Sequence, residues 1–277
     1  MKRFSLSAAA CALALTTFAL GGCTKKDEAA PAAQTGEFTL ELDNIVGFSP
    51  AGAAVPLVLS TNTYKNTNGD NFAVTTFKYY LSNVQLRKAD GSTYAVPDSY
   101  FLVDQANADS KSITMKNVPV GDYSAISFVV GVDSARTKAG NFTGVLNANS
   151  GMFWDWSKEF INLRFEGTSP QSPTGGLIFH VAGYKGGNGA NNTIRTLTLP
   201  FPSAGLLVRA DHSPEIHTYV NVLKLFTGPN PATTPPAPFQ NPVSFATVYN
   251  KMGGPAAVKI ADNIAAGMFT VSHIHAN

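Results

Sequence analysis

Residues 77–86 read Phe-Lys-Tyr-Tyr-Leu-Ser-Asn-Val-Gln-Leu (FKYYLSNVQL), a segment in which apolar side chains recur at every second position. Phe77, Tyr79 and Leu81 share one face of an extended chain, and Val84 follows after one shift of phase. Alternation with a period of two predicts a β-strand that buries one of its faces.

The same alternation recurs along most of the chain, with short turn signals between the segments. The segments are FTLELDNIV (38–46), YSAISFVVGV (123–132), LIFHVAGY (177–184), IRTLTLPF (194–201), IHTYVNVLKLF (216–226) and MFTVSHIH (268–275). The turn signals are Asn68-Gly69-Asp70, Ala89-Asp90-Gly91, Pro119-Val120-Gly121-Asp122 and Gly186-Gly187-Asn188-Gly189. This pattern predicts an antiparallel β-sandwich of roughly eight to twelve strands.

One region near the C-terminus departs from the strand pattern. Residues 228–242, GPNPATTPPAPFQNP, are rich in proline and predict an irregular surface connection. Residues 244–268 then predict a helix, because the apolar residues Ala257, Ile260, Ala261, Ile264 and Met268 recur at helical spacing. Pro255 suits the first turn of that helix. We therefore predict one mostly β domain over residues 37–277, with a short helical insertion before the last strand.

The N-terminus has the features of an export signal. Lys2 and Arg3 precede a short run of small and apolar residues that ends in Leu20-Gly21-Gly22-Cys23, which resembles the bacterial lipobox. We interpret residues 1–22 as a lipoprotein signal peptide, Cys23 as the lipidated residue and residues 23–36 as a flexible tether. The alternative is an ordinary secretory signal. The lipid-anchored form would lie in the cell envelope, on the periplasmic or surface face of the outer membrane.

Cysteine content and charge exclude several classes of site. Of the two cysteines, Cys11 leaves with the signal and Cys23 carries the lipid, so disulfides, thiolate metal sites and thiol nucleophiles are excluded from the mature domain. The 20 basic and 18 acidic residues become 18 and 18 without Lys2 and Arg3. The absence of net charge and of a basic stripe argues against a nucleic-acid partner.

The five histidines are the candidate metal ligands. His273 and His275 are two residues apart in a predicted strand, so both point to one face with Cα atoms about 6.5–7 Å apart. Two such imidazoles can converge on copper or zinc. His180 and His217 also lie in predicted strands, where a hydrogen-bonded or exposed histidine is the ordinary alternative. His212, followed by Ser213-Pro214, has the setting of a turn residue.

Trp154 and Trp156 also share one face if the segment is extended, and they can pack as an aromatic pair. The sequence contains no nucleophile elbow, zinc-protease motif, phosphate-binding loop or dinucleotide fingerprint. We therefore expect a binding protein and no enzyme. A hydrolase that uses Asp133, Glu159 and Glu166 is a further alternative, and it would need paired carboxylates in a cleft.

Taken together, several segments resemble the MbnP-like (methanobactin-partner) family of copper-binding proteins. They are FKYYLSNVQL, VPVGDYSAISFVVGVDSAR, GMFWDWSKEFINLRFEG, LIFHVAGY and the terminal His-x-His. The most specific part is Gly-Met-x-Trp-x-Trp followed by Glu-Gly, and the resemblance runs from about Phe38 to the C-terminus. The motif residues here are Gly151, Met152, Trp154, Trp156, Glu166 and Gly167.

This resemblance implies copper binding through histidines and an oxidised tryptophan, a kynurenine, which a partner di-haem enzyme of the peroxidase type produces. Relatives can place the modified tryptophan two residues from a ligating histidine, whereas Met152 and Lys158 occupy those positions here. The implied ligands are His180, His273 and His275, with Trp154 or Trp156 as a further partner.

Two functions remain open from the sequence. The first is a lipid-anchored copper-binding protein for acquisition, storage or transfer to a copper importer. The second is a surface β-sandwich module for carbohydrate or protein, with Trp154 and Trp156 in an aromatic platform. Indole rings open to water on a sheet would favour the module, and rings beneath converging imidazoles would favour the metal.

Overall fold

The computed structural model describes residues 34–185, 191–202, 205–229 and 238–276, without the side chains of residues 228, 229 and 238–242. The predicted signal peptide, Cys23 and the tether up to residue 33 lie outside the described residues. None of the described helices is long and apolar enough to cross a membrane. The first strand begins at Thr35, two residues before the predicted domain boundary, because Thr35 and Gly36 pair with Pro119 and Val118.

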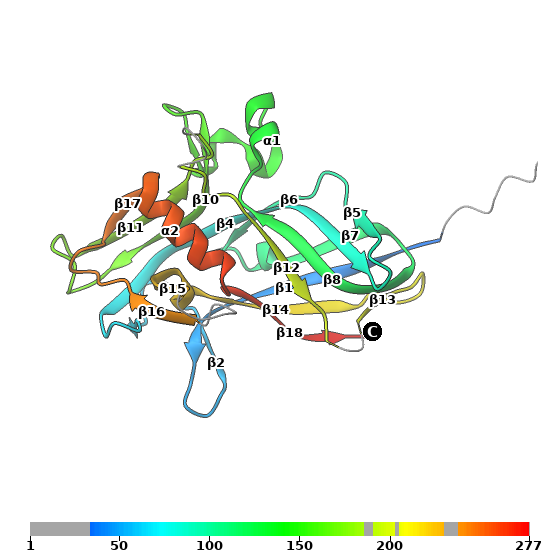
Figure 1. Ribbon diagram of the computed structural model, residues 1–277, viewed down its shortest axis with the longest axis horizontal. Helices are drawn as coiled ribbons and strands as arrows, with labels where there is room; N and C mark the ends of the chain where they lie inside the picture. The colour runs from blue at the N-terminus through cyan, green and yellow to red at the C-terminus, as the bar shows by residue number, and fades with distance from the viewer. Residues whose placement is uncertain (1–33, 186–190, 203–204, 230–237, 277) are drawn as a thin grey trace, which may run out of the picture. The chain divides into compact units, whose positions relative to one another are not determined.

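The domain is mostly β, as predicted, and its strands form two main sheets (Figure 1). The larger sheet has the order β12 (Arg195–Pro200), β8 (Gly121–Val130), β4 (Asn71–Lys88), β10 (Glu159–Thr168), β11 (Gly176–Ala182) and β17 (Asn250–Met252). Five short strands extend it: β3 (Tyr64–Lys65), β5 (Thr93–Ala95), β6 (Tyr100–Asp104), β9 (Phe153–Trp154) and β13 (Leu206–Val208).

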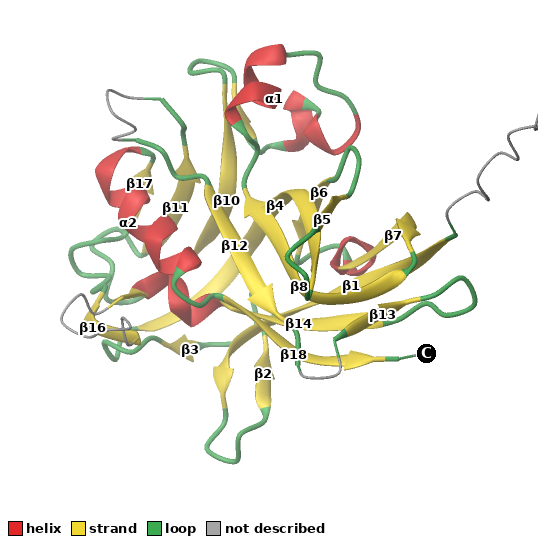
Figure 2. Ribbon diagram, turned by 45° about the vertical axis from the view of Figure 1, so that its right-hand side comes forward, coloured by secondary structure: helices red, strands yellow, loops and turns green. Residues whose placement is uncertain are grey.

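The smaller sheet carries the C-terminal strand. Its order is β18 (Phe269–His275), β14 (Glu215–Asn221), β1 (Thr35–Phe48) and β2 (Ala54–Pro56), and β7 (Ser112–Pro119) pairs with β1. The helices are α1 (Ser134–Ala139) and α2 (Gly254–Ala265), with 3₁₀ turns η1 (Ala108–Lys111), η2 (Gly144–Leu146), η3 (Ala148–Ser150) and η5 (Val222–Phe226). In Figure 2, α2 lies beside β11 and β12, which it contacts.

Strand β4 organises the larger sheet and contains the segment 77–86. It pairs with β8 on one side and with β10 on the other, and Phe77, Tyr79, Leu81 and Val84 are all fully buried. The shift of phase is a β-bulge at Asn83, whose φ is 52° and where the register with β8 changes. Asparagine tolerates this left-handed conformation better than most residues, so the extra residue is accommodated without ending the strand.

The two main sheets share one hydrophobic core rich in phenylalanine. Phe226, at the end of η5, is fully buried and lies 4.9–5.8 Å, centroid to centroid, from the rings of Phe72, Phe165, Phe179 and Phe245. Three of these contacts are edge-to-face and the fourth is tilted, and edge-to-face contact is a favourable geometry for aromatic pairs. This cluster joins residues from β4, β10 and β11 to the connection that follows β14.

Three predicted features need correction. The sandwich is not wholly antiparallel, because β1 pairs with β14 and β11 with β17 in parallel. The helix covers only Gly254–Ala265, because Asn250–Met252 pairs with β11 and Gly253 and Gly254 have φ values of 70° and 75°. The proline-rich segment is not wholly irregular, because β15 (Thr227–Pro229) pairs with β16 (Pro238–Pro242).

The buried face predicted for the helix is confirmed. Ala257, Ile260, Ala261 and Ile264 are buried, Met268 follows in the core, and Pro255 lies in the first turn. The turn at Asn66–Asp70 closes the hairpin between β3 and β4, as its sequence predicts. There the buried Asp70 carboxylate accepts a hydrogen bond from the Phe245 backbone N–H at 2.8 Å, so this carboxylate has a structural role.

Candidate metal centre and tryptophan centre

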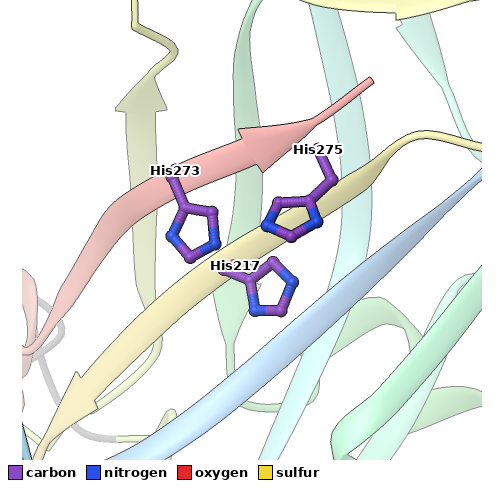
Figure 3. Close-up of side chains that lie close together, drawn as sticks. All are labelled: His217, His273 and His275. Atoms are coloured by element: carbon purple, nitrogen blue, oxygen red, sulfur yellow. The ribbon is translucent and has the colours of Figure 1, made fainter. Parts of the chain in front are cut away.

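Three histidines converge on the outer face of the smaller sheet, where β14 lies beside β18 (Figure 3). His217 of β14 is directly opposite His273 of β18, and His275 lies two residues further along the same face of β18. One ring nitrogen of each histidine lies within 4.8 Å of one ring nitrogen of the other two. We call this group the histidine centre.

The imidazoles of the histidine centre contact one another closely. The rings of His217 and His273 are stacked with centroids 4.5 Å apart, and the His275 ring is 4.9 Å and 4.7 Å from them. Desolvation, and then the neighbouring rings of His217 and His275, lower the pKa of His273. A neutral imidazole is the form that binds a metal, so this arrangement favours the coordinating state.

His217 is the least exposed of the three, with 23% of its side chain accessible. Its Nε2 is buried and has no hydrogen-bond partner, although the Glu215 Oε2 lies 3.7 Å away. Its Nδ1 lies 3.8 Å from Asp43 Oδ2. In His273, Nδ1 lies 3.0 Å from the Ser272 hydroxyl, which leaves Nε2 as the nitrogen that can coordinate.

These atoms fit a metal ion. A buried nitrogen without a partner costs free energy, and coordination of an ion would satisfy it. Three imidazole nitrogens suit copper or zinc, and carboxylates behind metal-ligating histidines commonly fix the orientation of the ring. The histidine centre therefore has both the donors and the supporting groups of a transition-metal site.

The two tryptophans form a second centre at the hairpin between β9 and β10. Their rings are stacked with centroids 5.1 Å apart, and Trp156 is 78% exposed while Trp154 is half-buried. Trp154 lies over Gly253, whose added Cβ would be 3.5 Å from the indole, and its ring is 6.1 Å from that of His180. We call Trp154, Trp156 and His180 the tryptophan centre.

A hydrogen-bonded network holds His180 in the tryptophan centre. His180 donates from Nε2 to Glu166 Oε1 at 2.8 Å, and Arg164 donates to the same oxygen from Nε at 2.9 Å. Arg164 also donates from a guanidinium nitrogen to the Gly151 carbonyl at 2.9 Å, which fixes the loop before Trp154. Nδ1 of His180 is buried and has no hydrogen-bond partner. Burial lowers the pKa of His180, and the Glu166 carboxylate opposes that effect.

The remaining residues of the Gly-Met-x-Trp-x-Trp…Glu-Gly motif are structural. Met152 is fully buried in a small second cluster with Tyr80, Phe160 and Ile161, so its sulfur is not available to an ion in solution. A Cβ on Gly167 would lie 2.2 Å from the Ala73 carbonyl oxygen of β4. The motif thus builds the tryptophan hairpin and fixes it to the sheet.

Replacing Glu166 with glutamine tests this network. We expect the pKa of His180 to fall further, because the carboxylate that raises it through a hydrogen bond and a charge is lost. The titration of the His180 ring protons by NMR measures this pKa. Glu37→Gln is the matched control, since Glu37 accepts a hydrogen bond from Ser213 and does not contact His180; an unchanged His180 pKa in Glu166→Gln would contradict the network.

The predicted ligands are therefore divided between two centres. His273 and His275 come together as predicted, but His217 and not His180 is the third histidine beside them. His180 belongs to β11 of the larger sheet and lies next to Trp154. The sequence offers the same signal for His180 and His217, a histidine in an alternating strand. Only the pairing of β14 with β18 distinguishes them.

The other candidates have structural partners. His212 is exposed at a turn, beside Asp211, as predicted. Asp133 caps α1 and accepts a 2.6 Å hydrogen bond from the Tyr100 hydroxyl. Glu159 is buried and accepts from the backbone N–H groups of Tyr184 and Lys185.

A family model described as MbnP matches residues 35–244. The chain belongs to the MbnP family. The matched span includes the tryptophan centre and His217 but ends before His273 and His275.

Among solved structures, the chain is similar to MbnP from Methylosinus trichosporium, with 15% sequence identity and a TM-score of 0.44. The alignment covers 70% of this chain and 78% of that chain. No curated protein matches the sequence.

Proposed function

We propose that this MbnP-family protein is a lipid-anchored copper-binding protein of the cell envelope, and that the histidine centre is its metal site. The observation that carries the proposal is the buried, unpartnered Nε2 of His217, which belongs to a group of three imidazoles within 4.8 Å of one another. Family membership supports copper as the ion, because the resemblance in sequence implies a methanobactin-related role.

The position of the histidine centre suits capture and release of an ion. His273 and His275 are exposed on β18, so an ion can reach them from solution and can pass to another protein. Lipidation of Cys23 would keep the captured ion near a membrane importer, which we propose as the receiving partner. The exposed Trp156 is open to a di-haem, tryptophan-oxidising enzyme of the kind that the resemblance implies.

A surface binding module for carbohydrate or protein is the second candidate, and one observation favours it. The indole of Trp156 is 78% exposed and stacks on Trp154, and the imidazoles of the histidine centre do not cover these rings. An open aromatic face of this kind can stack on a sugar ring. The two candidates use different centres, so the experiment below separates them.

Native mass spectrometry of the protein extracted from its own host membranes tests the proposal. We expect one copper ion per chain, an acyl-modified Cys23 at the N-terminus and a peptide map across residues 151–167 that reports whether either indole is oxidised. Protein from copper-replete cells that carries no copper would overturn the metal function and leave the binding module.

A further inference from the structure

We infer that Glu215 supplies a carboxylate as fourth ligand, so that the histidine centre is a three-nitrogen, one-oxygen site selective for divalent ions such as Cu²⁺ or Zn²⁺ over Cu⁺. This inference rests on the proposed metal function and names the class of ion. Its basis is the position of Glu215 among the three histidines.

The four side chains occupy four neighbouring positions on two paired strands. His217 is opposite His273, and Glu215 is opposite His275. Residues two apart on a strand share a face, and directly opposite residues have Cβ atoms about 4.5–5.5 Å apart. Glu215 therefore closes a square whose other three corners are the histidines, and it faces the same space.

The observed distance agrees with this placement. Glu215 Oε2 lies 3.7 Å from His217 Nε2, which is too far for a hydrogen bond and is a separation that an ion bound by both atoms could bridge. With metal–nitrogen and metal–oxygen distances of about 2.0–2.2 Å, two ligands of one tetrahedral ion lie roughly 3.3–3.6 Å apart. The Glu215 carboxylate does not lie within 4.8 Å of all three imidazole nitrogens in this structure, so coordination requires its side chain to turn toward His273 and His275.

Asp43 has a different place. Its Oδ2 lies 3.8 Å from His217 Nδ1, on the side of the ring away from Nε2. At this distance it is not hydrogen-bonded to the ring, and its effect is the negative charge that it places near the ion. Asp43 thus contributes charge, and Glu215 is the ligand.

The donor set favours a divalent ion. Carboxylate oxygen is a hard ligand, and thiolate or thioether sulfur is what selects Cu⁺. The mature chain has no cysteine outside position 23. Met115, Met152 and Met268 are buried, and Met252 lies on β17 of the larger sheet. No sulfur therefore accompanies the histidine centre among the residues that the structure describes.

The test compares Glu215→Gln with Glu41→Gln in full-length mature protein, extracted in detergent and freed of metal with a chelator. Glu41 is the matched control because it pairs with His217 in register on β1 but accepts a hydrogen bond from Ser112. Affinity for Cu²⁺ and for Cu⁺ is measured by competition with chromogenic chelators, and the Cu²⁺ environment by electron paramagnetic resonance.

We expect Glu215→Gln to weaken Cu²⁺ binding roughly 10–100-fold and to change the Cu²⁺ spectrum, with Cu⁺ affinity within about threefold of wild type. Glu41→Gln should behave as wild type. Unchanged Cu²⁺ affinity in Glu215→Gln, or an equal loss in Glu41→Gln, would overturn the carboxylate ligand while copper binding by the wild type keeps the metal function. A wild-type protein that binds neither ion would overturn both.

Discussion

Replacement of both His273 and His275 by alanine is expected to weaken Cu²⁺ binding by at least about 10³-fold. A structural zinc site draws about 10–16 kcal/mol from roughly four ligands, so removing two of them leaves His217 and Glu215 unable to hold an ion at micromolar concentration. Both side chains are exposed on β18. The metal-free fold should therefore change in stability by no more than about 0.5 kcal/mol.

Chelator competition measures the loss of affinity, and thermal unfolding of the metal-free protein measures its stability. His212→Ala is the matched control, because His212 is an exposed histidine at a turn beside Asp211 and lies outside the histidine centre. Stoichiometric, tight copper in the double variant would remove the histidine centre as the metal site. It would direct attention to His180 and the tryptophan centre.

The sequence predicted the part of the histidine centre that depends on residues close together along the chain, and not the part that depends on strand pairing. The pair His273 and His275 was predictable, because residues two apart on a strand share a face whatever else the chain does. The third member was not, because His217 is about 56 positions from His273 along the chain and meets it only through strand pairing. His180 carried an equal local signal, yet its strand belongs to the other sheet.

The same distinction holds for the fold. The buried faces of β4 and α2 followed from local periodicity, and even the bulge at Asn83 was visible as a shift of phase. The extent of the helix was not, because Asn250–Met252 pairs with β11, a partner about 70 residues earlier. Parallel pairing of β1 with β14 has no local signal, and the sequence therefore predicted an antiparallel sandwich without it.

The adjacent tryptophans show how one motif can combine structural and exposed residues. Met152 and Gly167 are required by packing, while Trp156 projects into solvent and gains little stability from burial. Arg164 and Glu166 connect the loop at Gly151 to His180. The exposed indole is thus held on a hydrogen-bonded base that the buried motif residues build.

Replacing Gly167 with valine should destabilise the protein by roughly 3 kcal/mol or more. A Cβ at this position would lie 2.2 Å from the Ala73 carbonyl oxygen and 3.2 Å from its carbon, so β10 and β4 could not keep their present pairing. Backbone atoms cannot move aside as a flexible side chain can. The shift would also displace Glu166, and with it the hydrogen bond that holds His180.

Gly176→Val is the matched control for this variant, because Gly176 lies in the same sheet and its nearest neighbour to an added Cβ is Thr174 Oγ1 at 3.8 Å. Chemical denaturation of both variants gives the difference in unfolding free energy, and the midpoint of Gly176→Val should stay close to that of the wild type. If Gly167→Val were as stable as Gly176→Val, the close approach of β10 to β4 would be wrong. The histidine centre and the tryptophan centre lie in different sheets. We therefore expect both variants to keep wild-type copper affinity, with a loss of stability in Gly167→Val alone. That result would show that Gly167 supports the tryptophan centre and not the histidine centre.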